Sequence, residues 1–225
     1  NHMDSISKAR MFVSHIKSLD DFIIVDEIDG SYNHMGATIA DAILQAGTNY
    51  ATVVEPRVNA ILKTYPDART TTAFRDLLER VGVKEVLSWK DDEKPNRVLA
   101  LTEFLLSEGI DTEQELRNWI SADQNRERIQ VVHGVGPKTA DYLRILVGFQ
   151  TAAVDRYVYR LLEEAGIATV SYEDAREILN LAADSLGVER SRFDHSVWKH
   201  MSQRKEVRRS QNSSDQGIEV NRSGT

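Results

Sequence analysis

Apolar residues recur three or four positions apart along most of the chain, which is the spacing of one face of an α-helix. Val54, Val58 and Ile61 begin one such stripe, and Pro66 marks its end. Stripes of the same kind run through residues 74–81, 98–105, 116–120, 158–165, 178–186 and 193–201. No stretch alternates apolar and polar residues for long enough to require a sheet. The pattern therefore predicts an all-α protein.

Residues that begin or end helices stand at the borders of these stripes. Thr72 is a candidate N-cap, and Gly82 is expected to end the same helix. Pro95 suits the first position of the next helix, with Gly109 just beyond its end. Thr112 opens a further helix with the spacing of a capping box. We expect antiparallel neighbours, because the connections between these helices are short.

Two segments lack the helical stripe. The run from Phe22 to Val25 fits a short strand or a buried helical segment, because four apolar residues in a row show no period. From Ser202 onward the chain is polar and has no apolar periodicity. This composition predicts a flexible tail over residues 202–225.

The composition excludes several kinds of site. The 225-residue chain contains no cysteine, which excludes disulfides, thiolate zinc sites and cysteine-ligated iron–sulfur clusters. Its 6 histidines are scattered without the spacing of a metal site, so we expect no metal cofactor. Nothing in the sequence has the form of a membrane span or of a secretory signal. We therefore expect an intracellular protein that does not enter a membrane.

The charge distribution bears on nucleic-acid binding. A formal net charge of −7 argues against a general nucleic-acid coat, because such proteins carry a basic excess that neutralises phosphates. Residues 126–160, however, contain six Lys and Arg residues against three Asp and Glu residues. We interpret this stretch as a local basic surface on an acidic body, which suits transient visits to DNA.

The most informative turn is Gly134-Val135-Gly136-Pro137, which precedes a helix predicted over residues 137–147. The two glycines permit a tight turn and a close backbone approach, and Pro137 suits the start of the helix. The amides of the turn and of the helix N-terminus would then hold a DNA phosphate whatever the base. Many helical hairpins use Gly-x-Gly only as a turn, so this motif alone leaves both interpretations open.

Lys138, in the first turn of that helix, and Asp155, 17 residues later, are the candidate catalytic pair. A helix over residues 137–147 climbs roughly 15 Å and the stretch 150–154 can return roughly 16 Å, so the spacing permits an ammonium–carboxylate contact. The helix dipole disfavours a cation at this place and would lower the pKa of Lys138, as a nucleophilic amine requires. The alternatives are a solvated surface lysine and an aspartate that caps the helix beginning at Arg156.

This part of the chain also resembles a known enzyme family. The residues VHGVGPKTA at 132–140, GF at 148–149 and AVDRYVYR at 153–160 resemble the hairpin, nucleophile and aspartate-ending loop of the HhH-GPD superfamily of DNA glycosylases. The lysine form of the motif is similar to the bifunctional endonuclease III enzymes. The resemblance is strong over about residues 130–160 and weaker but continuous over about 37–187.

The resemblance implies a two-lobed α fold with the active site in the cleft between the lobes. Residues 37–148 would form a six-helix barrel lobe that ends in the helix-hairpin-helix. Residues 4–36 and 149–201 would form the second helical lobe. The remaining residues, 202–225, would be the flexible tail.

The same resemblance implies roles for the motif residues. Lys138 would attack C1′ of a flipped-out nucleotide, while Asp155 would help to activate the lysine and stabilise an oxocarbenium-like sugar. The resulting Schiff base would allow strand cleavage by β-elimination. The implied partner is double-stranded DNA with a damaged or mispaired base, bound by a monomer in the cytoplasm, nucleoid or nucleus. The implied DNA-binding residues share the hairpin and the start of its second helix: Gly134, Val135, Gly136, Pro137 and Thr139.

The chain departs from the family pattern in several places. It cannot carry the C-terminal iron–sulfur loop of many endonuclease III proteins, although the hairpin stays compatible with a monovalent cation. His133 stands where proline is usual and Tyr157 where histidine is common, and both are candidate pocket residues. Gln45 lies near the position of a glutamine that fills the gap left by the flipped base. A buried polar helix residue explains Gln45 at least as well.

Two other functions fit parts of the sequence. A non-catalytic helix-hairpin-helix protein would hold DNA through the same turn, and an all-α scaffold for protein partners would account for the acidic surface. The combination of the hairpin with Lys138 and Asp155 favours a bifunctional DNA glycosylase and AP lyase over both. The damaged base cannot be named from the sequence, because its pocket is assembled from separated helices.

Overall fold

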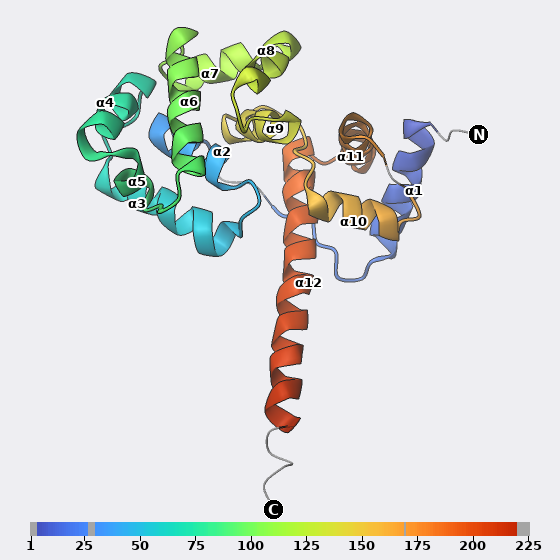
Figure 1. Cartoon of the computed structure of the whole chain (residues 1–225). Coiled ribbons are helices and arrows are strands. Elements are labelled where there is room, and N and C mark those ends of the chain that lie inside the picture. Colours follow the sequence, from blue (N-terminus) through green and yellow to red (C-terminus); the bar gives the residue numbers. More distant parts are fainter. Residues whose placement is uncertain (1–3, 27–29, 169, 220–225) are drawn as a thin grey trace, which may run out of the picture. The chain divides into compact units, whose positions relative to one another are not determined.

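The computed structural model describes residues 4–26, 30–168 and 170–219, with side chains as far as Arg204. Its regular structure is helical, and these ranges contain no β-strand (Figure 1). The prediction of an all-α protein is therefore confirmed. The chain forms two compact units. We name Asp29–Ala153 the hairpin unit, and Asn1–Ile28 together with Val154–Thr225 the terminal unit.

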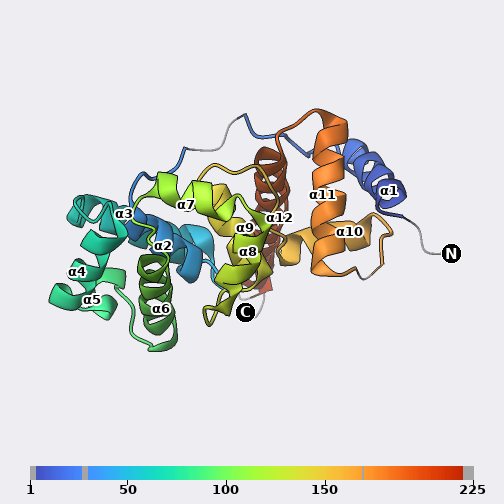
Figure 2. The same ribbon diagram turned by 90° about the horizontal axis from the view of Figure 1, so that it is seen from above.

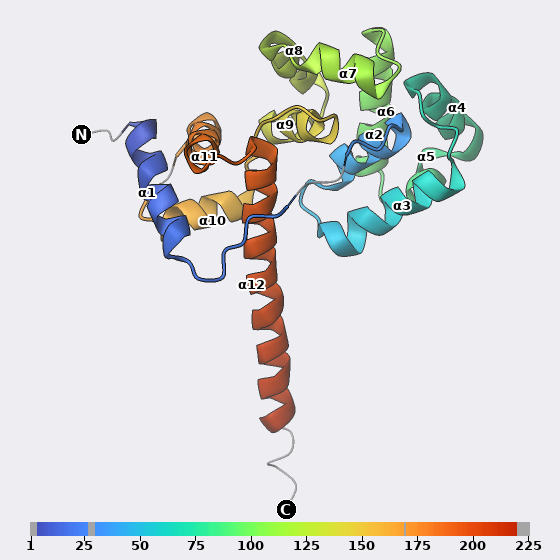
Figure 3. The same cartoon turned by 180° about the vertical axis from the view of Figure 1, so that it is seen from behind.

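The hairpin unit is built around one fully buried helix, α2 (Met35–Leu44). Every residue of α2 is buried, as expected of a helix that is mostly apolar around its whole circumference. It packs against α3, α4, α6 and α9, and Figure 3 shows α2 among these helices. The other helical elements of this unit are a π-helical turn (Tyr50–Val54), α3 (Glu55–Thr64), α4 (Thr71–Val81), α5 (Val83–Leu87), α6 (Glu93–Ser107), α7 (Glu113–Ile120), α8 (Asp123–Arg128), a 3₁₀ turn (Ile129–Val131) and α9 (Pro137–Leu146).

Two predicted helix starts in this unit are wrong by two residues. Thr70, not Thr72, caps α4, because its backbone is extended and its hydroxyl accepts a hydrogen bond from the Ala73 amide at 3.1 Å. Thr72 already lies inside the helix. Pro95 is the third residue of α6 rather than the first, since the helix begins at Glu93. Proline is tolerated there because the first-turn amides have no intrahelical acceptor.

The terminal unit consists of α1 (Ser5–Ser18), α10 (Arg156–Glu164), α11 (Tyr172–Leu186) and α12 (Arg190–Glu219). α1 packs along α11, as Figure 2 shows, and α12 packs against both α10 and α11. Phe193 of α12 lies at the centre of this core and meets Phe12 of α1 edge to face, with ring centroids 6.1 Å apart. None of the described helices is both long and apolar enough to span a membrane.

Two segments of the terminal unit differ from the sequence expectation. Residues 22–25 form neither strand nor helix, because the Val25 amide donates to the Ser196 hydroxyl at 3.0 Å and Arg192 donates to the Val25 carbonyl. The backbone groups of Val25 are thus satisfied by side chains of α12 rather than by a β-ladder or a helical turn. The sequence also predicts a flexible tail from Ser202, but α12 continues through it to Glu219. Residues 220–225 lie outside the described residues.

Candidate active site

The hairpin turn connects the 3₁₀ turn after α8 to the start of α9. Gly134 has a φ of +89°, a conformation that favours glycine, and the Val135 amide donates to the Val132 carbonyl at 3.0 Å. Gly136 has an ordinary extended backbone with a φ of −98°, so only Gly134 needs glycine for its conformation. Pro137 is the first residue of α9, as expected. Val135 is buried, which anchors the turn to the core.

The outer side of the turn is open at Gly136. A Cβ atom added there would meet no heavy atom within 4 Å. Gly136 is also the N-cap residue of α9, and it offers no side chain to the amides of the first helical turn. Backbone amides at an open helix start are suited to an anion such as a DNA phosphate.

Lys138 and Thr139 follow Pro137 in the first turn of α9, and Thr139 lies near the end of α2. Thr139 is buried, and the amide nitrogen Nε2 of Gln45 lies 3.4 Å from its hydroxyl oxygen. Gln45 also donates to the Ala42 carbonyl at 3.0 Å. Lys138 is half-buried. The structure thus brings Gln45 beside the start of α9, whereas His133 is exposed in the turn.

Asp155 lies in the terminal unit and is the N-cap of α10. Its Oδ1 accepts hydrogen bonds from the amides of Tyr157 at 2.9 Å and Val158 at 3.2 Å. The chain before it, residues 151–154, is buried. Tyr157 is buried too, and the guanidinium groups of Arg156 and Arg160 lie over its ring, 5.2 and 6.0 Å from the centroid. Asp155 is therefore a half-buried carboxylate at a helix N-terminus, a place where the helix dipole favours an anion.

A buried polar cluster in the hairpin unit was not anticipated from the sequence. Asp41 of α2 is 0% exposed and accepts hydrogen bonds from the hydroxyls of Tyr32 at 2.6 Å and Tyr142 at 2.7 Å. Burial raises the pKa of Asp41, and the two tyrosine hydrogen bonds oppose that rise. Burial and the charge of Asp41 in turn raise the pKa of Tyr142.

Helical spacing places this cluster next to the predicted site. Tyr142 lies one turn after Lys138 in α9, and Asp41 lies one turn before Gln45 in α2, so each pair is on the same side of its helix. The only sequence signal for the cluster was a lone carboxylate in an otherwise apolar helix. Its tyrosine partners are 9 and 101 positions away, which no local pattern reveals.

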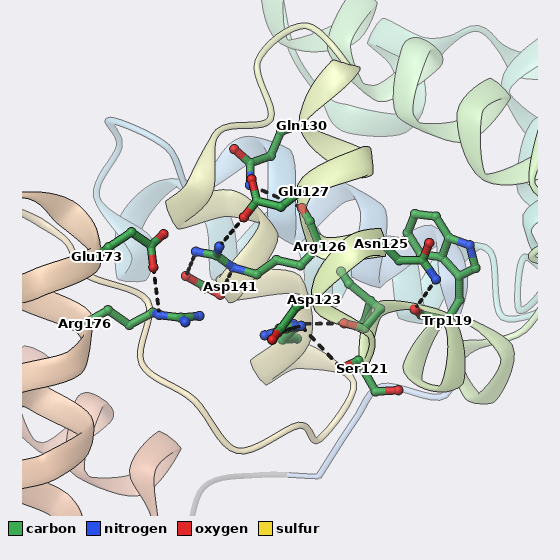
Figure 4. A network of polar contacts seen from close by, with 12 residues as sticks. Trp119, Ser121, Asp123, Asn125, Arg126, Glu127, Gln130, Asp141, Glu173 and Arg176 are labelled. Carbon is green, nitrogen blue, oxygen red and sulfur yellow. Dashed lines mark hydrogen bonds and ion pairs between the residues drawn. The ribbon is translucent and has the colours of Figure 1, made fainter.

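Two buried arginines join the hairpin helices through hydrogen bonds and ion pairs. Arg126 of α8 donates to both carboxylate oxygens of Asp141 in α9, at 2.7 and 2.8 Å (Figure 4). Arg144, one turn further along α9, donates to the Ile120 carbonyl at 2.9 Å and to Asp123 at 3.0 Å. Each bond ties α9 to the helices that precede the turn.

These contacts narrow the interpretation of residues 126–160 as a basic surface, because three of the six cations in this stretch form ion pairs. Arg126 and Arg144 are only 3% and 2% exposed; Arg126 pairs with the buried Asp141, and Arg144 pairs with the exposed Asp123. Arg128 is exposed but forms an ion pair with Glu108. The other three cations, Lys138, Arg156 and Arg160, are half-buried or exposed.

Comparison with known proteins gives a family. Residues 13–202 match the family described as "Domain of unknown function (DUF8548)". The chain belongs to this family. No curated protein matches its sequence. Among solved structures, it is similar to the crystal structure of Methanocaldococcus jannaschii 8-oxoguanine DNA glycosylase, with 16% identity and a TM-score of 0.49 over 86% of this chain and 84% of that chain.

Proposed function

We propose that the protein is a base-excision DNA glycosylase with an associated AP lyase activity. The observation that carries this proposal is the position of Lys138, in the first turn of α9 and directly after an open hairpin turn. The turn offers backbone amides to a phosphate, and the lysine two residues after Gly136 offers an amine to the nucleotide held there. A packing turn alone would need no such lysine.

In the proposed reaction, the neutral amine of Lys138 attacks C1′ of a nucleotide that has left the base stack. The new C–N bond forms as the glycosidic bond breaks, and the base departs with the bonding electrons and takes up a proton. The sugar ring then opens to a Schiff base, and β-elimination removes a proton from C2′, forms the C2′–C3′ double bond and breaks the C3′–O bond, so that the 3′ phosphate leaves with the bonding electrons. The carboxylate of Asp155 would stabilise the positive charge that develops on the sugar.

The substrate class follows from this chemistry. A base must leave the duplex before its glycosidic bond can be reached, and damaged or mispaired bases cost less to extract. We propose that the protein binds such duplex DNA as a monomer, in the compartment that holds the DNA. Gln45, His133 and Tyr157 are the proposed residues of the gap or the base pocket. The hairpin amides would hold the backbone independently of the lesion.

The first experiment traps the Schiff base. Wild-type protein is incubated with a panel of duplexes, each with one lesion or mismatch, in the presence of borohydride. We expect a covalent protein–DNA complex, because borohydride reduces an imine to a stable amine. Lys138→Gln should abolish it, and Lys63→Gln, at an exposed position of α3, should not. Undiminished trapping by folded Lys138→Gln would show that another residue is the nucleophile.

The second experiment separates binding from excision at Asp155. Asparagine also caps helices well, so Asp155→Asn should keep the α10 cap and the affinity for DNA. Excision in a single turnover should fall by orders of magnitude if the carboxylate acts on charge in the transition state. Unchanged excision would reduce Asp155 to a helix cap. Binding without trapping or excision by wild type across the panel would instead identify a non-catalytic helix-hairpin-helix DNA-binding protein.

A further inference from the structure

Two exposed arginines of α10 lie over one buried tyrosine ring. The guanidinium carbons of Arg156 and Arg160 are 5.2 and 6.0 Å from the centroid of the Tyr157 ring, and Tyr157 is only 8% exposed. The two arginines are four residues apart, so they are neighbours on one side of the helix. Both are exposed to solvent. A single buried ring therefore orients two cations at the surface of the terminal unit.

This stacking leaves the hydrogen-bonding edges of the guanidinium groups available. A guanidinium group over an aromatic ring uses its flat face, while its five N–H donors point outward in the plane of the group. Among the residues that the structure describes, neither Arg156 nor Arg160 has a hydrogen bond or an ion pair. The other arginines of α10–α12 with described side chains each contact an oxygen acceptor: Arg176 with Glu173, Arg190 with Asp184, Arg192 with the Val25 carbonyl and Arg204 with Glu164.

The nearby carboxylates of α10 do not neutralise the pair. Asp155 accepts hydrogen bonds from the amides that follow it, and Glu164 forms an ion pair with Arg204. Like charges four residues apart on a helix repel each other, and a bound anion would relieve that repulsion. Two adjacent positive charges are thus left for an external anion, on a chain whose net charge is −7.

We propose that Arg156 and Arg160 form a second phosphate-binding site, which holds the DNA backbone beside Asp155. That the phosphate belongs to DNA rests on the proposed function. Guanidinium groups fit phosphate because two parallel N–H groups can bond two oxygens of one phosphate. Asp155 is proposed to act on the sugar of the extruded nucleotide, and that sugar carries a phosphate on each side, so the arginine next to Asp155 is placed for the same nucleotide. The site would hold DNA whatever the base, and it does so from the terminal unit.

The test measures how the affinity for undamaged duplex DNA depends on salt. Each phosphate contact that is lost lowers the magnitude of the slope of log affinity against log salt by roughly 0.9. Arg156→Gln combined with Arg160→Gln should therefore lower it by roughly one to two and weaken binding by roughly tenfold or more at low salt. Arg156→Lys combined with Arg160→Lys should keep most of the slope but bind more weakly, because an ammonium group cannot make two parallel bonds.

The matched control removes two charges elsewhere. Lys63→Gln combined with Arg80→Gln takes away two exposed cations of α3 and α4 in the hairpin unit, and its slope should stay close to that of wild type. An unchanged slope in the variant with two glutamines on α10, or an equal decrease in the control, would overturn the proposal. Binding of polyglutamate in place of duplex DNA, lost in the same variant, would identify an acidic protein partner and overturn it as well.

If the variant with two glutamines on α10 does not fold, the wild-type protein decides. Duplex DNA should slow the modification of Arg156 and Arg160 by phenylglyoxal, measured by mass spectrometry of the peptides, and should leave the rate at Arg80 unchanged. Arginines that DNA does not protect would overturn the proposal. Borohydride trapping separates this site from the glycosylase. Trapping by wild type with an unchanged slope leaves the glycosylase and removes the second site, whereas a smaller slope in a protein that never traps DNA leaves the phosphate site and removes the enzyme.

Discussion

Replacing Arg126 by methionine should destabilise the hairpin unit by several kcal/mol. The guanidinium group donates to Asp141 at 2.7 and 2.8 Å, and the two side chains are 4% and 0% exposed. Methionine keeps most of the apolar stem but removes both charge-assisted hydrogen bonds, so the Asp141 carboxylate stays buried without the guanidinium group. Breaking a buried ion pair from one side costs about 3–5 kcal/mol, far more than the pair contributes relative to apolar residues.

The assay is urea unfolding at neutral pH, followed by far-UV circular dichroism and by tryptophan fluorescence. Two of the three tryptophans, Trp89 and Trp119, lie in the hairpin unit, and Trp198 lies in the terminal unit. Arg128→Gln is the matched control on the same helix, because Arg128 is 58% exposed and its pairing with Glu108 should contribute less than about 1 kcal/mol.

The reasoning also requires that removing both partners costs less than removing one. Arg126→Met combined with Asp141→Leu takes the charges away together, so most of the stability lost in Arg126→Met should return. A loss below about 1 kcal/mol in Arg126→Met, or no recovery in the double variant, would refute this account of the hairpin.

Two further predictions concern the same unit. Gly134→Ala should lower the free energy of unfolding by about 1–2 kcal/mol, because the φ of Gly134 is +89° and the Arg97 side chain must move, and it should weaken binding to intact and lesion-bearing duplexes alike. Gly136→Ala is the control and should leave thermal stability unchanged. Equal effects of the two variants on thermal stability would contradict the assigned backbone conformations. Burial raises the pKa of Asp41 above 3.8, so native protein binds more protons than unfolded protein between these two values. The stability of wild type relative to Asp41→Asn should therefore fall as pH rises through that window, and urea unfolding at a series of pH values that shows a constant difference would count against it.

The helices that could be predicted are those with one apolar face. The stripe of Phe193, Val197 and Met201 marks α12, and the three side chains are buried there. α2 could not be delimited in the same way, because a helix buried on every side shows no stripe. The cap of α4 was misplaced because Thr70, Thr71 and Thr72 are equivalent in sequence, and only the backbone conformation decides which hydroxyl faces the amides.

In the candidate site, too, local features could be predicted and long-range contacts could not. The turn at Gly134 and the cap at Asp155 are local features, so the sequence could predict their conformations. The contacts of Asp41 with Tyr142 and of Gln45 with Thr139 join residues far apart in the chain, and composition carries no trace of them. Charge counting failed at Arg126 for a related reason, since a count along the chain does not show which cations are neutralised inside the protein.

The open backbone at Gly136 also makes this position suitable for an introduced cysteine. The chain contains no cysteine, so Gly136→Cys would give the protein a single thiol. The φ of −98° and the free space around an added Cβ mean that the side chain can be accepted without moving its neighbours. At the N-terminus of α9 the helix dipole would favour the thiolate, which is the reactive form. A disulfide formed with a thiol-bearing duplex would then report on this one position of the hairpin, because no competing thiol exists elsewhere in the molecule.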